Sequence, residues 1–387
     1  MQNNSKNKKE CIYYSRFRLD PNLAGGNRRA AQIYRLLAKF DMIFNTVHNH
    51  KKTEQKSYVH RISKKSKKRF KLIDRIEKYF VTDGEYKLWD KSHKRHFYAV
   101  RAVSKKWAKS FVNDGNICFA AIDDPIYFTP LLRTLKQNKI PIVGMCHNIE
   151  SLVPGQVKTG RQTKLLGKEI DCLKLCNLVV TISREDYISL NNFNINAFFL
   201  PYYPVDDIVK GMLKIRDIRK SNIKKDFLFI GSAKNKPTLK GLLSFVRAWN
   251  EYNFACFGEK LLIAGYDTEN FSNYIKGKNI KLLGTLTNEE LDHQLSTVKA
   301  CICYQENGTG ALTKIQEMLI AGVPVMANIH AARSYYDADG LIEFSSFDEF
   351  KDSFKKIRQI EDNISIPRPP ETRYFYKALN CETLDLA

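Results

Sequence analysis

The chain contains 387 residues, of which 43% are hydrophobic and 12% aromatic, so it can bury a large core and global disorder is excluded. No run of about 18 apolar residues occurs, so no membrane-spanning helix is expected, and nine cysteines without zinc-site spacing favour buried, reduced thiols and a cytoplasmic location. The formal net charge of +22 favours phosphate-rich partners, either an anionic membrane surface or a nucleic acid.

The first half of the chain alternates apolar, strand-like runs with stretches of helical periodicity. The expected strands are 11–16, 42–47, 117–122, 140–146, 178–182 and 198–200, and the expected helices begin near residue 27 and cover 126–137 and 164–176. Ser183 is the expected N-cap of a further helix, with Asp186 at its third position. The two prolines of Pro201–Pro204 are typical of a stiff, extended linker.

A strongly basic region lies between the second and third of these strands. Residues 61–109 contain 17 Lys and Arg against five Asp and Glu. Two basic amphipathic helices are predicted here, at 61–80 and 86–112, and such helices can bind anionic membranes. The cations expected to do so are Lys64, Lys65, Lys67, Lys68, Arg69 and Lys71. The alternative is that each apolar stripe packs onto the sheet and the lysines are merely solvated.

Two features of the first half lie where a parallel sheet places its ligands. Gly25 and Gly26 sit between a strand and a helix, where backbone N–H groups can bind an anion; the alternative is a plain left-handed turn. His147 directly follows the strand 140–146, at a carboxyl end, and Glu150 lies just beyond it.

A second strand–helix series begins after residue 225. Its expected strands are 227–230, 260–264, 280–283, 300–304 and 323–326, and its expected helices are 238–249, 289–295, 347–360 and 371–379. Two such series joined by a proline linker predict an α/β protein with two Rossmann-like domains facing each other across a cleft. We expect one domain at 1–204, a second at 205–365, and a C-terminal segment, 366–387, that packs back on the first domain.

Residues 308–327, GTGALTKIQEMLIAGVPVMA, combine a turn, a helix and a buried strand. Gly308, Thr309 and Gly310 are expected to open the helix and to present N–H groups at the positive end of its dipole. Glu317 lies seven residues after Gly310 and is expected on the same face, while Lys314 could neutralise a phosphate or pair with a carboxylate.

These segments resemble the donor domain of GT-B glycosyltransferases, most closely glycosyltransferase family 4. The resemblance rests on FLFIGS, LLIAG, IKLLGTL and the 308–327 block, with GGNRRAAQIYRLLA, CHNIESL and LVVTISRED resembling that family's N-terminal domain. It covers nearly the whole chain and is weakest over 50–115. It implies a GT-B fold and transfer of a sugar from a UDP- or GDP-sugar to a glycan or lipid-linked acceptor, in bacterial surface polysaccharide or glycoconjugate synthesis.

The resemblance also implies roles for particular residues. Glu317 would accept hydrogen bonds from the ribose hydroxyls, and His147 would approach the donor sugar or phosphate. A cation near the first donor-domain loop would meet the diphosphate; Lys234, Lys236 and Lys240 are candidates, and Lys240 is preferred because Gly241 follows it. Gly25 and Gly26 would face the diphosphate from the other domain. Thr309 stands where many members carry a Glu that contacts the donor sugar. The resemblance therefore does not predict which sugar is transferred.

The same resemblance implies retention of anomeric configuration, with no cofactor and no metal. The two basic helices predicted at 61–80 and 86–112 favour a cytoplasmic protein that lies on the inner face of the plasma membrane. A non-catalytic GT-B-like protein that binds nucleic acid or membrane is the alternative, although no RNA-binding module or interleaved exposed aromatics support nucleic acid. A nicotinamide-dependent enzyme is disfavoured because no G-x-G-x-x-G follows the first strand.

Overall fold

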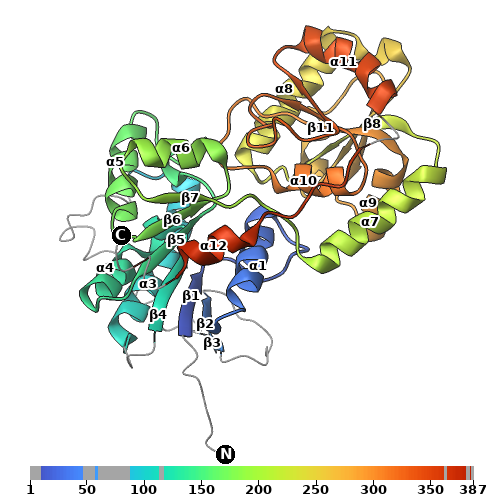
Figure 1. Ribbon diagram of the computed structural model, residues 1–387. Coiled ribbons are helices and arrows are strands. Elements are labelled where there is room, and N and C mark those ends of the chain that lie inside the picture. Colours follow the sequence, from blue (N-terminus) through green and yellow to red (C-terminus); the bar gives the residue numbers. More distant parts are fainter. Residues whose placement is uncertain are drawn as a thin grey trace, which may run out of the picture. The chain divides into compact units, whose positions relative to one another are not determined.

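The computed structural model describes residues 10–46, 57–59, 88–112, 117–360, 364–380 and 384. The chain forms two compact units, Met1–Pro201 with Glu371–Ala387, and Tyr202–Pro370 (Figure 1). The first boundary falls inside the predicted linker, and the second falls after Pro370 rather than after residue 365. No helix among the described residues is long and apolar enough to cross a bilayer.

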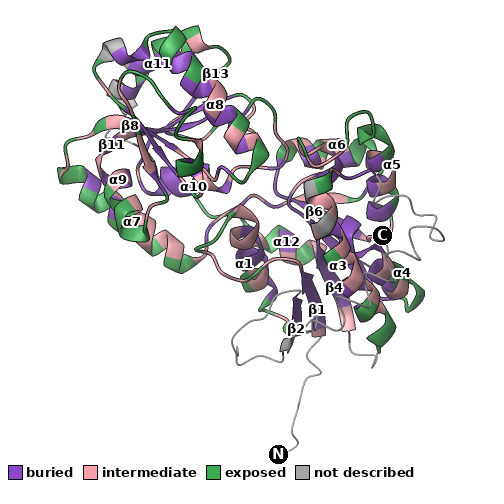
Figure 2. Ribbon diagram, turned by 180° about the vertical axis from the view of Figure 1, so that it is seen from behind, coloured by how far each residue is buried: buried purple, intermediate pink, exposed green. Residues whose placement is uncertain are grey.

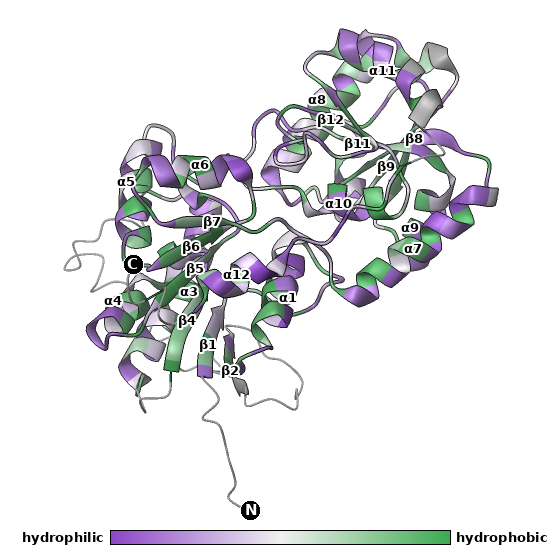
Figure 3. Ribbon diagram, in the orientation of Figure 1, coloured by the Kyte–Doolittle hydropathy of each residue, from purple (hydrophilic) through white to green (hydrophobic). Residues whose placement is uncertain are grey.

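The first unit is built on a seven-stranded parallel sheet with the order β3-β2-β1-β4-β5-β6-β7. Its strands are β1 (Glu10–Ser15), β2 (Asp41–Thr46), β3 (Ser57–Val59), β4 (Ile117–Asp123), β5 (Ile142–Cys146), β6 (Leu178–Thr181) and β7 (Ala197–Phe199). The central strands are buried on both faces (Figure 2), as is usual for a parallel sheet covered by helices. In Figure 3, the central strand β4 is accordingly hydrophobic.

Helices cover both faces of this sheet. They are α1 (Gly25–Leu37), α3 (Lys91–Ser110), α4 (Thr129–Gln137), α5 (Gln162–Leu173), α6 (Arg184–Asn192) and α12 (Thr372–Ala378), with short 3-10 turns η2 (Pro125–Phe128) and η3 (Glu150–Leu152). Ser183 caps α6 through the N–H of Asp186, as predicted. The C-terminal α12 buries Phe375 and Leu379 in the same core as Ile33 and Leu37 of α1, which ties the chain's last segment to the first unit.

The second unit is built on a six-stranded parallel sheet with the order β10-β9-β8-β11-β12-β13. Its strands are β8 (Lys225–Ile230), β9 (Leu261–Ala264), β10 (Ile280–Gly284), β11 (Val298–Cys303), β12 (Val325–Asn328) and β13 (Leu341–Phe344). Its helices are α7 (Asp206–Ser221), α8 (Lys236–Glu251), α9 (Asn288–Thr297), α10 (Thr313–Ile320) and α11 (Phe347–Ile360), with turns η4 (Phe254–Phe257) and η5 (Thr268–Phe271). An aromatic cluster that includes Phe229, Phe245 and Phe350 fills the core on one side of the sheet.

Two elements of this unit were not predicted. Helix α7 lies between the predicted linker and the predicted start of the second series, where no element was expected, and of its residues only Ile215 and Arg219 are buried. Arg219 donates to the carbonyl oxygens of Leu295 and Val298, at 2.5 and 2.8 Å, so a buried guanidinium replaces the apolar stripe that a sequence pattern would detect. Strand β13 is only four residues long, which is too short for a recognisable period.

Candidate functional site

Each sheet has one point where its strand order reverses. In the second unit this switch point lies between β8 and β11, and in the first unit it lies between β1 and β4. Connections leave such a pair in opposite directions, so the loops after the two strands splay apart at their carboxyl ends and leave room for a ligand. The residues that follow these strands are therefore the candidates for function in each unit.

Glycines line the carboxyl edge of the second sheet. Gly231 follows β8, Gly265 follows β9 and Gly284 ends β10. At Gly265, where φ is +144°, an added Cβ would lie 2.0 Å from the carbonyl oxygen of Gly231. At Gly231 it would lie 2.3 Å from Thr238 Cγ2. Only glycine fits these two close approaches, so the edge presents main chain rather than side chains.

The Gly-Thr-Gly turn lies on the loop after β11, beside this edge. The prediction that it opens a helix directly is wrong: α10 begins at Thr313, and its N-cap, Leu312, is extended. Gly310 is left-handed, with φ of +66°, so it turns the chain before the helix can start. The argument that Gly310 and Glu317 share a helical face therefore fails, and Glu317 instead lies four residues after the first residue of α10.

Two residues missed by sequence reasoning hold this loop, one at the end of β12 and one in the segment that follows it. The side chain of Asn328 accepts a hydrogen bond from the N–H of Gln305 at 3.0 Å and donates to its carbonyl oxygen at 2.6 Å. Arg333 donates to the carbonyl oxygen of Gly308. These contacts fix both the start of the loop and its Gly-Thr-Gly turn.

Lys314 lies at the centre of the second switch point. Its Nζ donates to the carbonyl oxygen of Ile230 at 2.6 Å and lies 3.6 Å from the position a Cβ would take at Gly231. The partner is thus a carbonyl at the end of β8. The half-buried ammonium group brings a positive charge to the glycine edge.

Glu317 is buried, with 5% of its surface exposed, which removes the alternative of an ordinary surface glutamate. Its Oε1 accepts a hydrogen bond from the hydroxyl of Tyr202 at 2.7 Å. Tyr202 is itself 2% exposed and belongs to the segment predicted only as a linker. A buried carboxylate held in this way has a fixed direction, which a carboxylate that recognises a diol requires.

The three candidate cations of the first donor-domain loop, Lys234, Lys236 and Lys240, are all exposed. Lys234 Nζ donates to the hydroxyl of Tyr266 at 3.0 Å and lies 4.4 Å from the centre of its ring. Lys240 was preferred because Gly241 follows it, but an added Cβ at Gly241 would lie 2.2 Å from the carbonyl oxygen of Tyr304. Packing of α8 on β11 therefore explains Gly241, and it gives no reason to prefer Lys240.

In the first unit, α1 begins at Gly25, and its N-cap Ala24 offers no side-chain hydrogen bond. Neither Gly25 nor Gly26 has a positive φ, so the alternative of a left-handed turn is wrong. An added Cβ at Gly26 would lie 2.3 Å from the ring of Phe17. The second glycine is thus explained by the aromatic ring that lies against the start of the helix.

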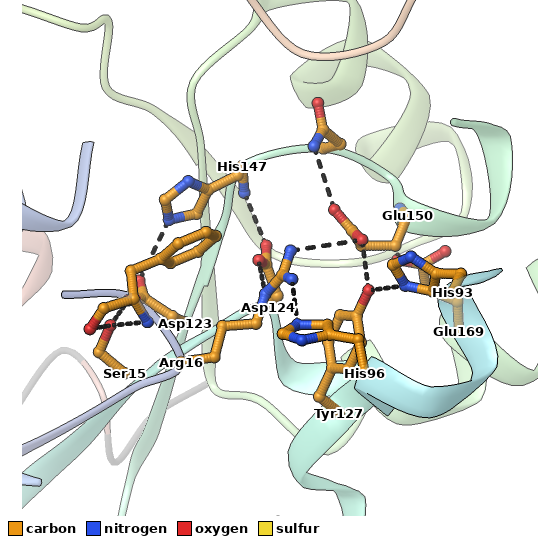
Figure 4. Close-up of polar contacts among 12 residues, drawn as sticks. Ser15, Arg16, His93, His96, Asp123, Asp124, Tyr127, His147, Glu150 and Glu169 are labelled. Atoms are coloured by element: carbon orange, nitrogen blue, oxygen red, sulfur yellow. Dashed lines mark hydrogen bonds and ion pairs between the residues drawn. The ribbon is translucent and has the colours of Figure 1, made fainter. Parts of the chain in front are cut away.

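A buried carboxylate, Asp123, ends β4 at the first switch point (Figure 4). Its Oδ2 accepts hydrogen bonds from the hydroxyls of Tyr13, at 2.7 Å, and Ser15. Its Oδ1 lies 3.3 Å from Nε2 of His147. Burial, and then the negative charge of Asp123, raise the pKa of Tyr13 well above its usual value, so this hydroxyl keeps its proton and acts as a donor.

His147 is 7% exposed and is fixed on three sides. Its backbone N–H donates to Oδ1 of Asp124 at 3.0 Å, its Nε2 faces Asp123, and its ring stacks on Phe17 with 4.5 Å between ring centres. The sequence predicted His147 from its place after a strand. The same reasoning applied to the ends of β1 and β4 would have found Arg16 and Asp123.

Arg16 and Glu150 form the second part of this network. Arg16 Nε donates to Asp124 at 2.7 Å, and the guanidinium lies 3.4 Å from Glu150 and 2.9 Å from Nε2 of His96. The hydroxyl of Tyr127 donates to Glu150 at 2.6 Å. Burial alone would lower the pKa of Arg16, but the surrounding negative charges raise it above its usual value, so the residue stays charged.

Glu169 of α5 supports the loop that carries His147. Its two carboxyl oxygens accept from the N–H groups of Glu150 and Ser151, at 2.8 and 2.7 Å. Burial raises the pKa of Glu169 to about 8, against the lowering effect of these hydrogen bonds. Glu150, which the sequence placed just beyond His147, is thus a member of a buried network.

The cations expected to bind a membrane, Lys64, Lys65, Lys67, Lys68, Arg69 and Lys71, lie outside the described residues. The second basic helix is α3, and the prediction that its apolar stripe can lie on a membrane is wrong. Phe97, Val100 and Trp107 are at most 3% exposed and pack in the core with α4 and the sheet. The alternative holds for α3, in which the stripe packs on the sheet and lysines such as Lys106 and Lys109 face solvent.

Within the described residues, no group of His, Cys, Asp and Glu side chains is arranged to hold a metal ion. The polar groups at the second sheet edge are those of the backbone, of Lys314, of Arg333 and of Glu317. At the first sheet edge they are those of His147 and of the network around Arg16.

No protein-family model and no curated protein sequence matches the chain. Its structure is similar to that of α,α-trehalose 6-phosphate synthase from Burkholderia multivorans, with a TM-score of 0.61, 10% identity, and coverage of 97% of this chain and 96% of that one. It is similar to the catalytic domain of starch synthase IV from Arabidopsis thaliana, with a TM-score of 0.62, 10% identity, and coverage of 97% and 99%. WaaG, a glycosyltransferase involved in lipopolysaccharide biosynthesis, gives a TM-score of 0.56, 10% identity, and coverage of 97% and 94%.

These structures define the class of fold. Two parallel, helix-covered sheets aligned with them over nearly the whole chain are the GT-B fold of glycosyltransferases, as the sequence predicted. Identities this low show the fold alone, and the activity has to be argued from the residues of this chain.

Proposed function

We propose that this protein is a glycosyltransferase that moves a sugar, in the simplest case a hexose, from a UDP- or GDP-sugar to a glycan or lipid-linked acceptor. The observation that carries the proposal is the carboxyl edge of the second sheet. There, glycine main chain surrounds the switch point, and a buried, oriented carboxylate, Glu317, stands on the helix that follows. A nucleoside diphosphate needs these two things: N–H groups for its phosphates and an acceptor for its ribose hydroxyls.

The diphosphate would be bound without a metal. Backbone N–H groups of Gly308, Thr309 and Gly310 and of the loop after β8 would meet the phosphate oxygens, and Lys314 and one of the exposed lysines would add positive charge. Lys314 supports this role because its Nζ already lies beside Gly231. Glu317 would accept hydrogen bonds from the ribose hydroxyls.

In the reaction, an acceptor hydroxyl would attack the anomeric carbon on the face that the diphosphate leaves. The bond from that carbon to the diphosphate oxygen breaks, its electron pair stays with the diphosphate, and the hydroxyl proton passes to the same oxygen. The product keeps the anomeric configuration of the donor. The enzyme's contribution is to stabilise the charge that develops on the leaving diphosphate.

The first unit would bind the acceptor and contribute His147, which would touch the donor sugar or its phosphate. The placement of His147 at the switch point between β1 and β4, over a network of buried polar groups, supports this role. Gly25 and Gly26, at the uncapped start of α1, would add N–H groups that face an anion.

The acceptor would belong to a bacterial surface polysaccharide or glycoconjugate, made at the inner face of the plasma membrane. WaaG, which shares the fold, is described as a glycosyltransferase of lipopolysaccharide biosynthesis. The basic residues between Lys64 and Lys71 would supply the membrane contact, because clustered cations attract anionic lipids. Changing five of these cations to Glu should abolish binding to anionic liposomes, and unchanged binding would remove the membrane part of the proposal.

The experiment that tests the activity is a thermal-shift screen against UDP-, GDP-, ADP- and CMP-sugars, followed by turnover measurements with the one that stabilises. A ligand at 100 times its Kd should raise the free energy of unfolding by about 2.7 kcal/mol. Stabilisation by UDP- or GDP-sugars, with release of the diphosphate when an acceptor extract is added, supports the proposal. No stabilisation by any of the four classes contradicts it.

A second candidate is a GT-B protein that binds phosphate-rich partners without catalysis. Thr309 favours it, because a sugar-contacting carboxylate often occupies that position in the family that the chain resembles. Binding of a nucleoside diphosphate with no dependence on the attached sugar, and salt-dependent binding of oligonucleotides, would support this candidate over the transferase.

A further inference from the structure

We propose that Asp123 is a positioning residue for His147, and that it holds the imidazole as the Nε2–H tautomer so that Nδ1 accepts a hydrogen bond from a sugar hydroxyl. This inference rests on the proposed transferase function, and it names an atom and a proton position within it. The sequence identified His147 as a candidate because it follows a strand. The role of Asp123 is inferred from its contacts in the structure.

The first step is the number of hydrogen bonds that Asp123 accepts from hydroxyl groups. Ser15 Oγ accepts a hydrogen bond from the backbone N–H of Phe17 at 3.0 Å, so its own proton is available to Asp123 Oδ2. Tyr13 donates to the same oxygen at 2.7 Å. A carboxylate that receives two hydroxyl protons on one oxygen has only acceptor capacity left on the other.

The second step is the tautomer. Oδ1 of Asp123 lies 3.3 Å from Nε2 of His147 and can only accept, so a neutral imidazole must carry its proton on Nε2. Nδ1 then has a free lone pair. Phe17 stacks on the ring and fixes its plane, and a half-turn of the ring that keeps this plane would place carbon instead of Nε2 opposite Asp123, so the contact with Asp123 favours the observed orientation.

The third step is where Nδ1 points. Among the residues that the structure describes, Nδ1 of His147 has no hydrogen-bond partner, although only 7% of the residue's surface is exposed. Nδ1 is also not one of the fully buried polar atoms that lack a partner, so it keeps some access to solvent. A buried ring with one satisfied nitrogen and one acceptor open to solvent is suited to a ligand that brings an O–H.

Gly26 belongs to the same arrangement. Any side chain there would collide with the Phe17 ring, which lies on the other side against His147. Two parts of the chain that are distant in the sequence thus fix one imidazole: the end of β4, and the segment that runs from the loop after β1 to the start of α1.

The test is an NMR measurement on the ligand-free protein labelled with ¹⁵N-histidine, at about pH 9, where an ordinary imidazole is neutral. His147 is assigned by its absence from the spectrum of His147→Gln. We expect a single Nε2–H tautomer in the wild type and a mixture of tautomers in Asp123→Ala. The matched control is Ser15→Ala, which removes a donor to Oδ2 but leaves Oδ1 opposite Nε2, and it should keep the wild-type pattern.

An Nδ1–H tautomer in the wild type overturns the proposal, and so does an unchanged spectrum in Asp123→Ala. If Asp123→Ala does not fold, the wild-type spectrum alone still decides. This readout needs no substrate, so it is independent of whether the transferase assignment is right.

Binding measurements then identify the hydroxyl. His147→Ala and Asp123→Ala should each weaken a sugar-dependent step by about tenfold, the value of one hydrogen bond, and the double variant should lose no more than the single ones. Weaker binding of the nucleotide-sugar, with unchanged binding of the bare diphosphate, places the hydroxyl on the donor. A raised KM for the acceptor alone places it on the acceptor, and no change in either overturns the proposal.

Discussion

At the switch point of the first sheet the surface is made of side chains, whereas at that of the second sheet it is made of main chain. The β1/β4 edge carries Asp123, His147 and Arg16 in a network of hydrogen bonds. The β8/β11 edge carries Gly231 and Gly265, whose backbones approach too closely for any Cβ. The two edges therefore suit different parts of a ligand. Backbone N–H groups suit a diphosphate, which every nucleotide-sugar carries, and side chains suit the hydroxyls by which one sugar differs from another; this is the division that the proposed function requires.

The largest effect should come from the one buried carboxylate on the main-chain side. In the proposed function, Glu317→Ala would remove an acceptor for two ribose hydroxyls, and we expect it to weaken nucleotide binding by about 100-fold, measured by calorimetry. The control is Glu343→Ala, on the exposed side of β13, which should bind as the wild type does. Full affinity in Glu317→Ala would mean that the ribose is recognised elsewhere.

The glycine edge can be broken directly. In Gly265→Ala the new Cβ meets the carbonyl oxygen of Gly231 at a φ of +144°, so the two loops must separate. We expect a loss of about 2 kcal/mol in unfolding free energy, together with weaker nucleotide binding. Gly211→Ala is the matched control in the same unit: it lies within α7 with nothing within 4 Å, and it should stabilise by about 1 kcal/mol.

The side-chain edge should respond to pH where the glycine edge does not. The pKa of Glu169 is raised to about 8 in the folded protein and is ordinary in the unfolded chain, so the folded state binds the extra proton. Its contribution to stability is complete below about pH 4.5, falls as pH rises, and is lost by about pH 8.

Denaturant unfolding at several pH values measures this contribution. Relative to Glu169→Gln, the wild type should lose roughly 3 to 4 kcal/mol between about pH 5 and pH 8, and little more above that range. A difference that is constant with pH would show that Glu169 has an ordinary pKa in the fold.

The smallest effects should come from the exposed lysines. Lys234→Ala and Lys240→Ala each remove one solvated charge from the region of the diphosphate, and we expect nucleotide Kd to rise roughly two- to fivefold. The effect should shrink at high salt, because exposed charges are screened. An equal response to both variants would fit the structure, in which Gly241 gives Lys240 no special place.

The sequence predicted the order of helices and strands well, and it predicted poorly which side chains contact each other across the fold. Alternating strands and helices, the proline linker and the cap at Ser183 are local patterns, and each was predicted. Helix α7 was not, because its buried arginine finds partners more than 70 residues away. The start of α10 was misplaced because a left-handed Gly310 and an extended Leu312 were read as the first turn of a helix.

The same limit applies to the candidate sites. His147 could be found from its position after a strand, but Arg16 and Asp124 are separated by 108 residues and meet only in the folded sheet. Tyr202 was assigned to a linker because nothing local indicates that its hydroxyl reaches Glu317, 115 residues later. Gly26 was noticed as a glycine, but the ring of Phe17 that requires it was not.

The most direct test of the account is hydrogen exchange of the wild-type protein with and without the nucleoside diphosphate of its donor. If the main-chain edge of the second sheet binds the diphosphate through N–H groups, protection should appear in peptides that cover 231–236 and 305–317. Protection confined to the loops of the first unit, or no protection in these two segments at saturating ligand, would contradict the account.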